Sequence, residues 1–337
     1  MKRLSLHQFE RARRFLKTEA RQIDRALFEH RFEAAPPDRV TDALASYHNA
    51  DGGFGHALEP DVQTPSSSAL ATGIALGILR ELDRPARDPM VGGAVAYLVE
   101  TFDEETEVWR AIPWDANDYP HAPWWQDEEG SLARAFDDFV VIPRAQLVGL
   151  LHHYAELVPE AWLDTVTEKT VSAIESLDED AFGGGGDTLR YALELVETEA
   201  LPQRFKHRLL PRLRDLTARI VSREPDEWAD YCATPLKVAP SPAGAVAGLL
   251  KDDLQLNLDY VIDHQTDEGT WEPTWTWGPT YPEAWEEAKH EWRGRLTLET
   301  LNSLRAFRRI DTEGTPGTRW PSTDAASRTG KDHVEQE

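Results

Sequence analysis

The chain has 337 residues, of which 40% are hydrophobic, so it is long enough to bury a substantial core. Its formal net charge of −24 disfavours binding to nucleic acid and to anionic lipid, because both also carry negative charge. The single cysteine, Cys232, rules out an intrachain disulfide. No run of about 18 apolar residues is present, and the charged first residues lack a signal-peptide pattern, so we expect a cytoplasmic protein without a transmembrane helix.

Apolar residues recur with a period of about 3.6 along most of the chain, and prolines and glycines separate the periodic segments. Alternation of the β-strand type over six or more residues is missing. The sequence therefore predicts an all-α protein. The predicted helices span 6–31, 37–48, 66–83, 88–100, 143–157, 160–177, 187–198, 202–221, 240–250, 252–265, 281–291 and 295–309.

Two distant segments share one pattern. Residues 42–55 read DALASYHNADGGFG, and residues 259–271 read DYVIDHQTDEGTW. In both, an apolar helix end is followed by His or Gln, an acid, glycine and an aromatic residue, and a second helix comes next. Weaker copies of the pattern lie between these two segments. They indicate about five repeats, each made of a helix, a loop with acidic and aromatic residues, a second helix and a short link.

The motifs HNADGGFG and HQTDEGTW resemble the repeats of squalene-hopene cyclases and protein prenyltransferase β subunits, where Q-x-x-D-G-G-F-G and Q-x-x-x-G-x-W recur. The resemblance implies a single α/α toroid of about five to six helix pairs over residues 1–310, in a bacterial or archaeal branch of that superfamily. Residues 311–337 are polar and rich in turn formers, and we expect them to form a disordered tail.

In such a toroid the inner and outer helices alternate, so all loops that follow outer helices lie at one end, where sites are normally found. These loops are predicted at 49–65, 101–142, 178–186, 222–239 and 266–294.

Ten of the 12 tryptophans fall in these loops, and only Trp162 and Trp320 lie elsewhere. We therefore predict a ligand site at this end of the molecule. Packing between repeats is the alternative role for these rings, above all for Phe54 and Trp271. The predicted ligand-binding residues are His56, Tyr119, Trp124, Trp125, Trp228, Tyr231, Trp275, Trp277 and Arg293.

Carboxylates and a histidine in the first two loops are the candidates for acid–base catalysis. Glu59 and Asp61 flank a proline just before a predicted helix, where a role in anchoring the loop is the alternative. Asp115, Asp118 and His121 stand in the segment WDANDYPHAPWWQDE, which combines few polar groups with aromatic side chains as small-molecule sites do. A lid packed on the rim is the alternative for this second segment.

Protein prenyltransferases hold a catalytic zinc ion with an Asp-x-Cys pair and a histidine just before the last inner helix. The resemblance implies Asp230 and Cys232 for the pair, but residues 293–295 read Arg-Gly-Arg and His290 lies several residues early. We therefore predict no metal or other cofactor, with zinc on Asp230, Cys232 and His290 as the less favoured alternative.

The Asp-x-Asp-Asp motif with which squalene-hopene-type cyclases protonate an alkene is absent, and the chain has the length of one toroid rather than two. The resemblance still implies a small apolar or isoprenoid-type ligand in the central cavity. Carbohydrate-active α/α barrels, which use paired carboxylates and stack sugars on tryptophan, are the first alternative. A non-catalytic binding or scaffold protein is the second, so the sequence leaves open whether the protein is an enzyme.

Overall fold

The computed structural model describes residues 1–126 and 141–311. Within these residues the chain forms twelve α-helices and one pair of short strands, which confirms the predicted all-α class. None of the described helices combines the length and the apolar character needed to cross a membrane. The predicted disordered tail lies, after Asp311, outside the described residues.

The helices of the first half are α1 (Leu6–Thr18), α2 (Gln22–Glu33), α3 (Asp38–Leu44), α4 (Ala69–Glu81), α5 (Pro89–Glu100) and α7 (Arg144–His153). Those of the second half are α8 (Glu160–Ser176), α9 (Asp187–Glu197), α10 (Gln203–Ile220), α11 (Pro235–Val238), α12 (Lys251–Asp263) and α13 (Pro282–Ala306). The antiparallel strands are β1 (Phe102–Asp103) and β2 (Val108–Trp109), which follow α5.

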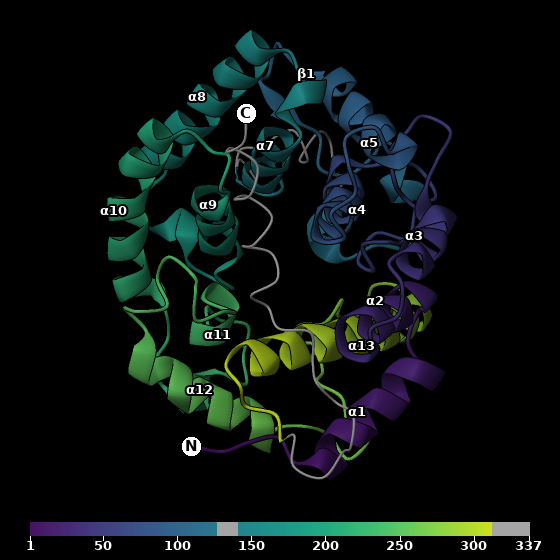
Figure 1. The fold of residues 1–337 in the computed structure, drawn as a ribbon, viewed down its shortest axis with the longest axis vertical. Helices are drawn as coiled ribbons and strands as arrows, with labels where there is room; N and C mark the ends of the chain where they lie inside the picture. Colours follow the sequence, from purple (N-terminus) through teal and green to yellow (C-terminus); the bar gives the residue numbers. More distant parts are fainter. Residues whose placement is uncertain (127–140, 312–337) are drawn as a thin grey trace, which may run out of the picture.

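Figure 1 shows the helices in two layers around the middle of the molecule. α1, α3, α5, α8, α10 and α12 lie at the periphery, and α4, α7, α9, α11 and α13 lie closer to the middle. Neighbouring inner helices pack on one another from α4 through α7 and α9 to α11, and α10 packs on α8 and α9. α13 packs on α1 and α2, which come from the other end of the chain.

The pattern of burial explains which helices lie inside. In the peripheral helix α10, the buried apolar side chains from Phe205 to Leu216 are three or four residues apart, so one face is covered and the other meets solvent. α7 is buried at every position from Arg144 to His152 except Gln146. A helix that is buried on all sides has neighbours on both of its faces, as an inner helix does.

The two ends of the described chain lie side by side. Leu4 and Ile310 form a parallel β-bridge, and the Leu4 N–H donates to the Arg309 carbonyl at 2.7 Å. The Arg309 side chain is buried, and its guanidinium donates to the Lys2 carbonyl and to the Asp259 carboxylate of α12. These contacts join the first residues, the end of α13 and α12.

Two of the predicted helices differ in their boundaries. The helix predicted at 6–31 is divided into α1 and α2 at residues 19–21. The segment 240–250, predicted as a helix, forms turns instead, and a four-residue helix, α11, precedes it. Pro240 and Pro242 explain the second error, because each lacks a backbone donor and restricts the residue before it to extended conformations.

The helices predicted at 281–291 and 295–309 are one continuous helix, α13. Residues 292–294, which the prediction leaves between two helices, are helical, and Gly294 serves close packing. A Cβ atom at this position would lie 3.1 Å from the Ala20 Cβ and 3.3 Å from the Asp24 Oδ2. The glycine therefore allows α13 to approach the junction of α1 and α2.

Candidate functional site

The loops that the sequence analysis places at one end do contact one another. Between the first and second loops, the Gln63 N–H donates to the Pro120 carbonyl at 3.0 Å, and the Ala122 N–H donates to the Asp61 carbonyl at 2.9 Å. The fifth loop reaches the first through the Trp277 indole, whose N–H donates to Asp61.

Tyr231 connects the other two loops to this group. Its ring lies 6.1 Å from the Trp275 ring, edge to face, between the fourth and fifth loops. Gly185 of the third loop leaves room for the Tyr231 ring, since a Cβ atom there would lie 2.2 Å from it. Each of the five predicted loops therefore contacts at least one of the others.

Asp61 is a buried carboxylate, with 4% of its surface exposed. Its Oδ1 atom accepts hydrogen bonds from the Nε1 atoms of Trp277 and Trp292, both at 2.8 Å. No donor from the described residues reaches its second oxygen, Oδ2. One oxygen of Asp61 is therefore fixed by two indole donors.

Burial raises the pKa of Asp61 from 3.8 to about 7, and the negative charge of Glu59 adds to the shift. The two indole hydrogen bonds and Arg295 stabilise the carboxylate and oppose the shift, but they do not outweigh burial. A carboxyl group with a pKa near neutral pH exists in both protonation states under ordinary conditions. That property is what a general acid or base requires.

Glu59 lies two residues before Asp61 and pairs with Arg295 of α13, with 2.9 Å between Oε2 and Nη1. Burial raises the pKa of Glu59, although Arg295 opposes the shift. Arg295 also pairs with Glu299 at 3.0 Å and lies over the ring of Trp292, 4.8 Å from its centroid. One face of α13 therefore holds the partners of both acids.

A small pocket opens beside Glu59. Its walls come from residues 55–71, and Leu58, Val62 and Leu70 supply much of its apolar surface. Its cavity volume is about 10 Å³, roughly enough for one water molecule. Glu59 is thus the member of the acid pair that lines a cavity.

Four tryptophans surround the buried acid. The centroids of the Trp277 and Trp285 rings lie 5.6 Å apart, and Trp275 meets Trp292 edge to face at 4.9 Å. Three of these rings are buried together with apolar side chains of the first two loops, and Trp275 packs against them. These rings form a wall of low polarity, which accounts for the strong effect of burial on Asp61.

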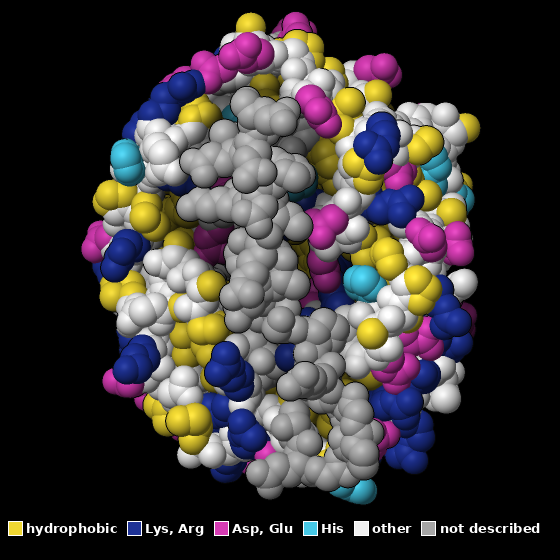
Figure 2. Space-filling view, in the orientation of Figure 1, with side chains coloured by type: hydrophobic (Ala, Val, Ile, Leu, Met, Phe, Trp, Pro, Cys, Tyr) yellow, Lys and Arg dark blue, Asp and Glu magenta, His cyan; other side chains and the backbone are white. Residues whose placement is uncertain are grey.

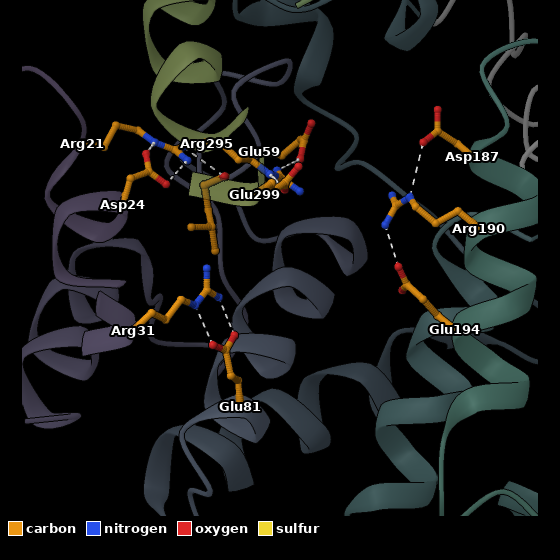
Figure 3. A network of polar contacts seen from close by, with 11 residues as sticks. Arg21, Asp24, Arg31, Glu59, Glu81, Asp187, Arg190, Glu194, Arg295 and Glu299 are labelled. Carbon is orange, nitrogen blue, oxygen red and sulfur yellow. Dashed lines mark hydrogen bonds and ion pairs between the residues drawn. The ribbon is translucent and has the colours of Figure 1, made fainter. Parts of the chain in front are cut away.

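The start of α9 carries a second charged group. Arg190 pairs with Asp187 at 3.6 Å and with Glu194 at 2.6 Å. Figure 3 shows Arg190 directed toward the side on which Glu59, Arg295 and Glu299 lie. Burial alone would lower the pKa of Arg190, but its carboxylate neighbours, Glu299 among them, raise it.

Asp187 also accepts hydrogen bonds from the Tyr231 hydroxyl and, at 2.9 Å, from the Lys237 ammonium group. Acidic side chains are visible toward the middle of the molecular face drawn in Figure 2. The region between α9 and α13 is therefore charged as well as aromatic, and its described arginines and lysine are paired with carboxylates.

His121, from the second loop, is fully buried. Its Nδ1 atom lies 2.7 Å from the Tyr119 carbonyl, its Nε2 atom lies 2.9 Å from the Gln126 side chain, and its ring lies 5.5 Å from that of Tyr281. Both ring nitrogens thus have partners within the protein. These contacts fix the second loop against the start of α13.

The other predicted residues of the second loop differ in exposure. Asp115 is partly buried and accepts hydrogen bonds from the hydroxyls of Thr64 and Ser66, at 3.1 and 2.7 Å. Trp125 is buried, whereas Trp124 and Asp118 are exposed. Asp115 therefore anchors the first loop.

Three predicted ligand-binding residues make their contacts elsewhere. Trp228 is buried against Tyr260, and its indole donates to the Ser222 carbonyl at 3.1 Å. Arg293 pairs with Glu268. His56 is exposed, and its only described hydrogen bond joins it to Asn49 at 2.9 Å.

The candidate zinc ligands also point to other partners. The Cys232 thiol donates to the Glu227 carbonyl at 3.3 Å, and His290 contacts the Glu19 carbonyl at 2.9 Å, while Asp230 is exposed. Among residues 1–126 and 141–311, no three His, Cys, Asp or Glu side chains are placed to hold one metal ion.

Sequence reasoning did not assign Trp292, Arg295 or Glu299 to the acid site. Their spacing of three and four residues puts them on one helical face. The predicted helices end at 291 and begin again at 295, so Trp292 was not placed on the same helix as Arg295 and Glu299. Arg190 gave no comparable signal, since an arginine within a helix is common on any surface.

No protein-family model matches the chain, and neither a curated protein nor a solved structure shows significant similarity to it. The resemblance to cyclases and prenyltransferases therefore stays a prediction. Function must be argued from the geometry of the site.

Proposed function

We propose that the protein is an α/α toroid enzyme in which Asp61 donates a proton to a neutral, hydroxylated substrate of the carbohydrate class. The observation that carries this proposal is the environment of Asp61. It is a buried carboxyl with a pKa of about 7, held through one oxygen by two indole N–H groups. Perturbed acids of this kind are concentrated at catalytic sites.

Two features of the fold support the toroid. The helices occupy a peripheral and an inner layer (Figure 1), and a β-bridge between Leu4 and Ile310 joins the first described residues to the last. Contacts among the five long loops support a common functional end.

The charges around the site favour a neutral substrate. Arg295 pairs with two carboxylates, Glu59 and Glu299, and Arg190 also pairs with two. These arginines therefore offer little net positive charge to a diphosphate. The partly exposed Trp275 and the neighbouring carboxylates and guanidinium groups instead suit a ligand rich in hydroxyls, which exchanges hydrogen bonds with the charged groups.

The proposed reaction is cleavage of a bond between carbon and oxygen. Protonated Asp61 gives its proton to the leaving oxygen, the bond breaks, and the substrate carbon gains positive charge. The two indole N–H groups stabilise the Asp61 carboxylate that results, and Glu59 lies close enough to influence Asp61 electrostatically. Water then adds to the carbon, and its proton returns the carboxylate to the acid form.

An apolar or isoprenoid-type ligand is the second candidate. The observation in its favour is the wall of Trp275, Trp277, Trp285 and Trp292, because indole faces stabilise cations. In that reaction Asp61 would protonate an alkene rather than an oxygen. Both candidate reactions therefore require Asp61, and they differ in the substrate.

The test is incubation of the purified protein with a panel of oligosaccharides and aryl glycosides and with a panel of isoprenoid alcohols and diphosphates. Products are identified by mass spectrometry. We expect turnover of a glycoside and a rate lower by about 10²–10⁴ in Asp61→Asn, as is typical for loss of a general acid. Asp252→Asn, an exposed carboxylate at the start of α12, is the matched control and should keep the full rate.

Turnover of isoprenoids alone would overturn the proposed substrate class. An Asp61→Asn variant with the full rate would overturn the role of Asp61. A protein that retains a ligand in native mass spectrometry but converts no member of either panel would favour the non-catalytic binding protein.

A further inference from the structure

The segment that leads to Glu59 and Asp61 contains an unusual backbone conformation. His56 and Ala57 have φ angles of 54° and 58°, in the left-handed region. For residues with a Cβ atom this region is unfavourable, and two such residues in succession persist only when surrounding contacts hold them.

Arg21 makes contacts that hold this turn. Its Nη1 atom donates to the carbonyl oxygens of Ala57 and Leu58 at 3.3 and 3.2 Å. Asp24 fixes the guanidinium in turn, with 2.8 Å between Nε and Oδ2 and 3.2 Å between Nη2 and Oδ1. Both side chains of this pair are buried, and Figure 3 shows them beside the group formed by Arg295 and Glu59.

Arg21 also faces α13. The Glu291 carboxylate lies 4.0 Å from its Nη1 atom and directly precedes Trp292, which donates to Asp61. Burial raises the pKa of Glu291 to about 7, although Arg21 opposes the shift. Arg21 therefore lies between the two elements whose relative position sets the hydrogen bond from Trp292 to Asp61.

We propose that Arg21 is a positioning residue for the acid site. By clamping the carbonyls of Ala57 and Leu58, it keeps the left-handed turn in place, so that Glu59 meets Arg295 and Asp61 meets its two indoles. The clamped residues also line the pocket beside Glu59, so the same contacts set the shape of that pocket. The effect on turnover rests on the proposed function, whereas the effect on the geometry of Asp61 does not.

The test compares Arg21→Gln with the wild type in two measurements. The first is the pH dependence of tryptophan fluorescence, because two indoles are bonded to Asp61 and respond to its ionisation. In the wild type we expect a transition near pH 7 that is smaller in Asp61→Asn, where Glu291, beside Trp292, still titrates in this range. In Arg21→Gln the midpoint should move upward by about half a unit or more, because the indole hydrogen bonds that favour the carboxylate are weakened.

The second measurement is turnover of the substrate found in the panels. We expect kcat to fall about tenfold or more in Arg21→Gln, since a small displacement of a catalytic group is costly. Ala57→Gly in the same chain should restore part of this loss, because glycine adopts positive φ without a steric penalty. Ala34→Gly is the matched control, since Ala34 has a φ of 56° at the end of α2 and makes no contact with the site.

Unchanged midpoint and kcat in Arg21→Gln would overturn the positioning role. Equal rescue by Ala34→Gly would also overturn it, because rescue would then reflect general stability. If Arg21→Gln does not fold, Arg21→Lys keeps the charge but loses the planar fork, and it should show the same changes at smaller size. If the wild type and Asp61→Asn titrate identically, the proposed function is overturned. In that case the near-ultraviolet circular dichroism of the indoles tests the role of Arg21 separately. An unaltered spectrum in Arg21→Gln would show that Arg21 does not position the indoles.

Discussion

The Trp292 indole donates a 2.8 Å hydrogen bond to Asp61, a residue 231 positions away in the sequence. The bond joins the loop before α4 to α13, the last helix among the described residues. Trp277 donates to the same oxygen from the segment before α13. The acid is therefore assembled only when distant parts of the chain have come together, and its ionisation reports on that assembly.

Asp61 should make stability depend on pH. Its pKa is raised from 3.8 to about 7, so between these values the folded protein holds a proton that the unfolded chain has released. The contribution of Asp61 to the free energy of unfolding therefore falls as pH rises through this range, by ~4 kcal/mol at most. Asp61→Asn lacks this effect, so its stability relative to the wild type should increase between about pH 4 and about pH 8. Urea unfolding at several pH values measures the difference, and a difference that is constant with pH would contradict the expectation.

Replacing one indole donor should raise the pKa of Asp61 further. Trp292→Phe removes an N–H that stabilises the carboxylate, and a hydrogen bond to a charged group of this kind corresponds to a shift of about one pKa unit. Trp271→Phe is the matched control, because both rings are 8% exposed but the Trp271 indole donates to the Val261 carbonyl. Carbon-13 NMR of labelled aspartate carboxyls gives the titration midpoint. Equal midpoints in the two variants would show that the indole hydrogen bond has no influence on Asp61.

Two helical glycines should respond in opposite ways to substitution by alanine. Gly77 of α4 has no atom within 4 Å of an added Cβ, so Gly77→Ala should stabilise the protein by about 0.5–1 kcal/mol through helix propensity. Gly294→Ala gains the same propensity but places its Cβ 3.1 Å from that of Ala20. We expect it to be destabilising by about 1–2 kcal/mol as α13 is pushed away from α1 and α2. Thermal unfolding compares the two, and stabilisation by both would refute the close approach of α13.

Arg309 should contribute strongly to closure of the fold. Arg309→Met removes donors to the Lys2 carbonyl and to Asp259, and we expect it to cost about 2–4 kcal/mol of unfolding free energy. The neighbouring Arg308 has an exposed side chain, so Arg308→Met should change stability by less than about 0.5 kcal/mol. Denaturant unfolding gives both values, and hydrogen exchange at Leu4 should be faster in the Arg309 variant. A neutral Arg309→Met would mean that the contacts at the chain ends do not limit stability.

Local patterns in the sequence were sufficient to predict the positions of nearly all the helices. The period of apolar residues located nearly all of them, because that period follows from which face of a helix is buried. The apolar period did not reveal that α13 continues through residues 292–294. Gly294 lies there because it allows close contact with Ala20, which no local pattern reveals. The period also failed at 240–250, where small apolar residues suggested a helix in spite of two prolines.

The candidate site was accessible to sequence reasoning only in part. Glu59, Asp61 and Trp277 were identified because they lie in loops of distinctive composition. Arg21 was not, because it stood inside a predicted helix and reaches Ala57 across 36 residues of sequence. Pairings of this kind depend on how elements pack, and one sequence does not contain that information in local form.

The meeting of Leu4 with Ile310 has a consequence for how the chain folds as it is synthesised. α1 packs on both α2 and α13. Phe9 contacts Phe28 and Phe32 of α2, whereas Phe15 contacts His290 of α13, so the part of the apolar face that holds Phe15 lacks its α13 partner until α13 has been synthesised. Contacts between residues so far apart carry a large loop-closure entropy and tend to form slowly. The nascent protein therefore carries part of the apolar face of α1 without its α13 partner for much of translation, and exposed apolar surface of this kind favours aggregation.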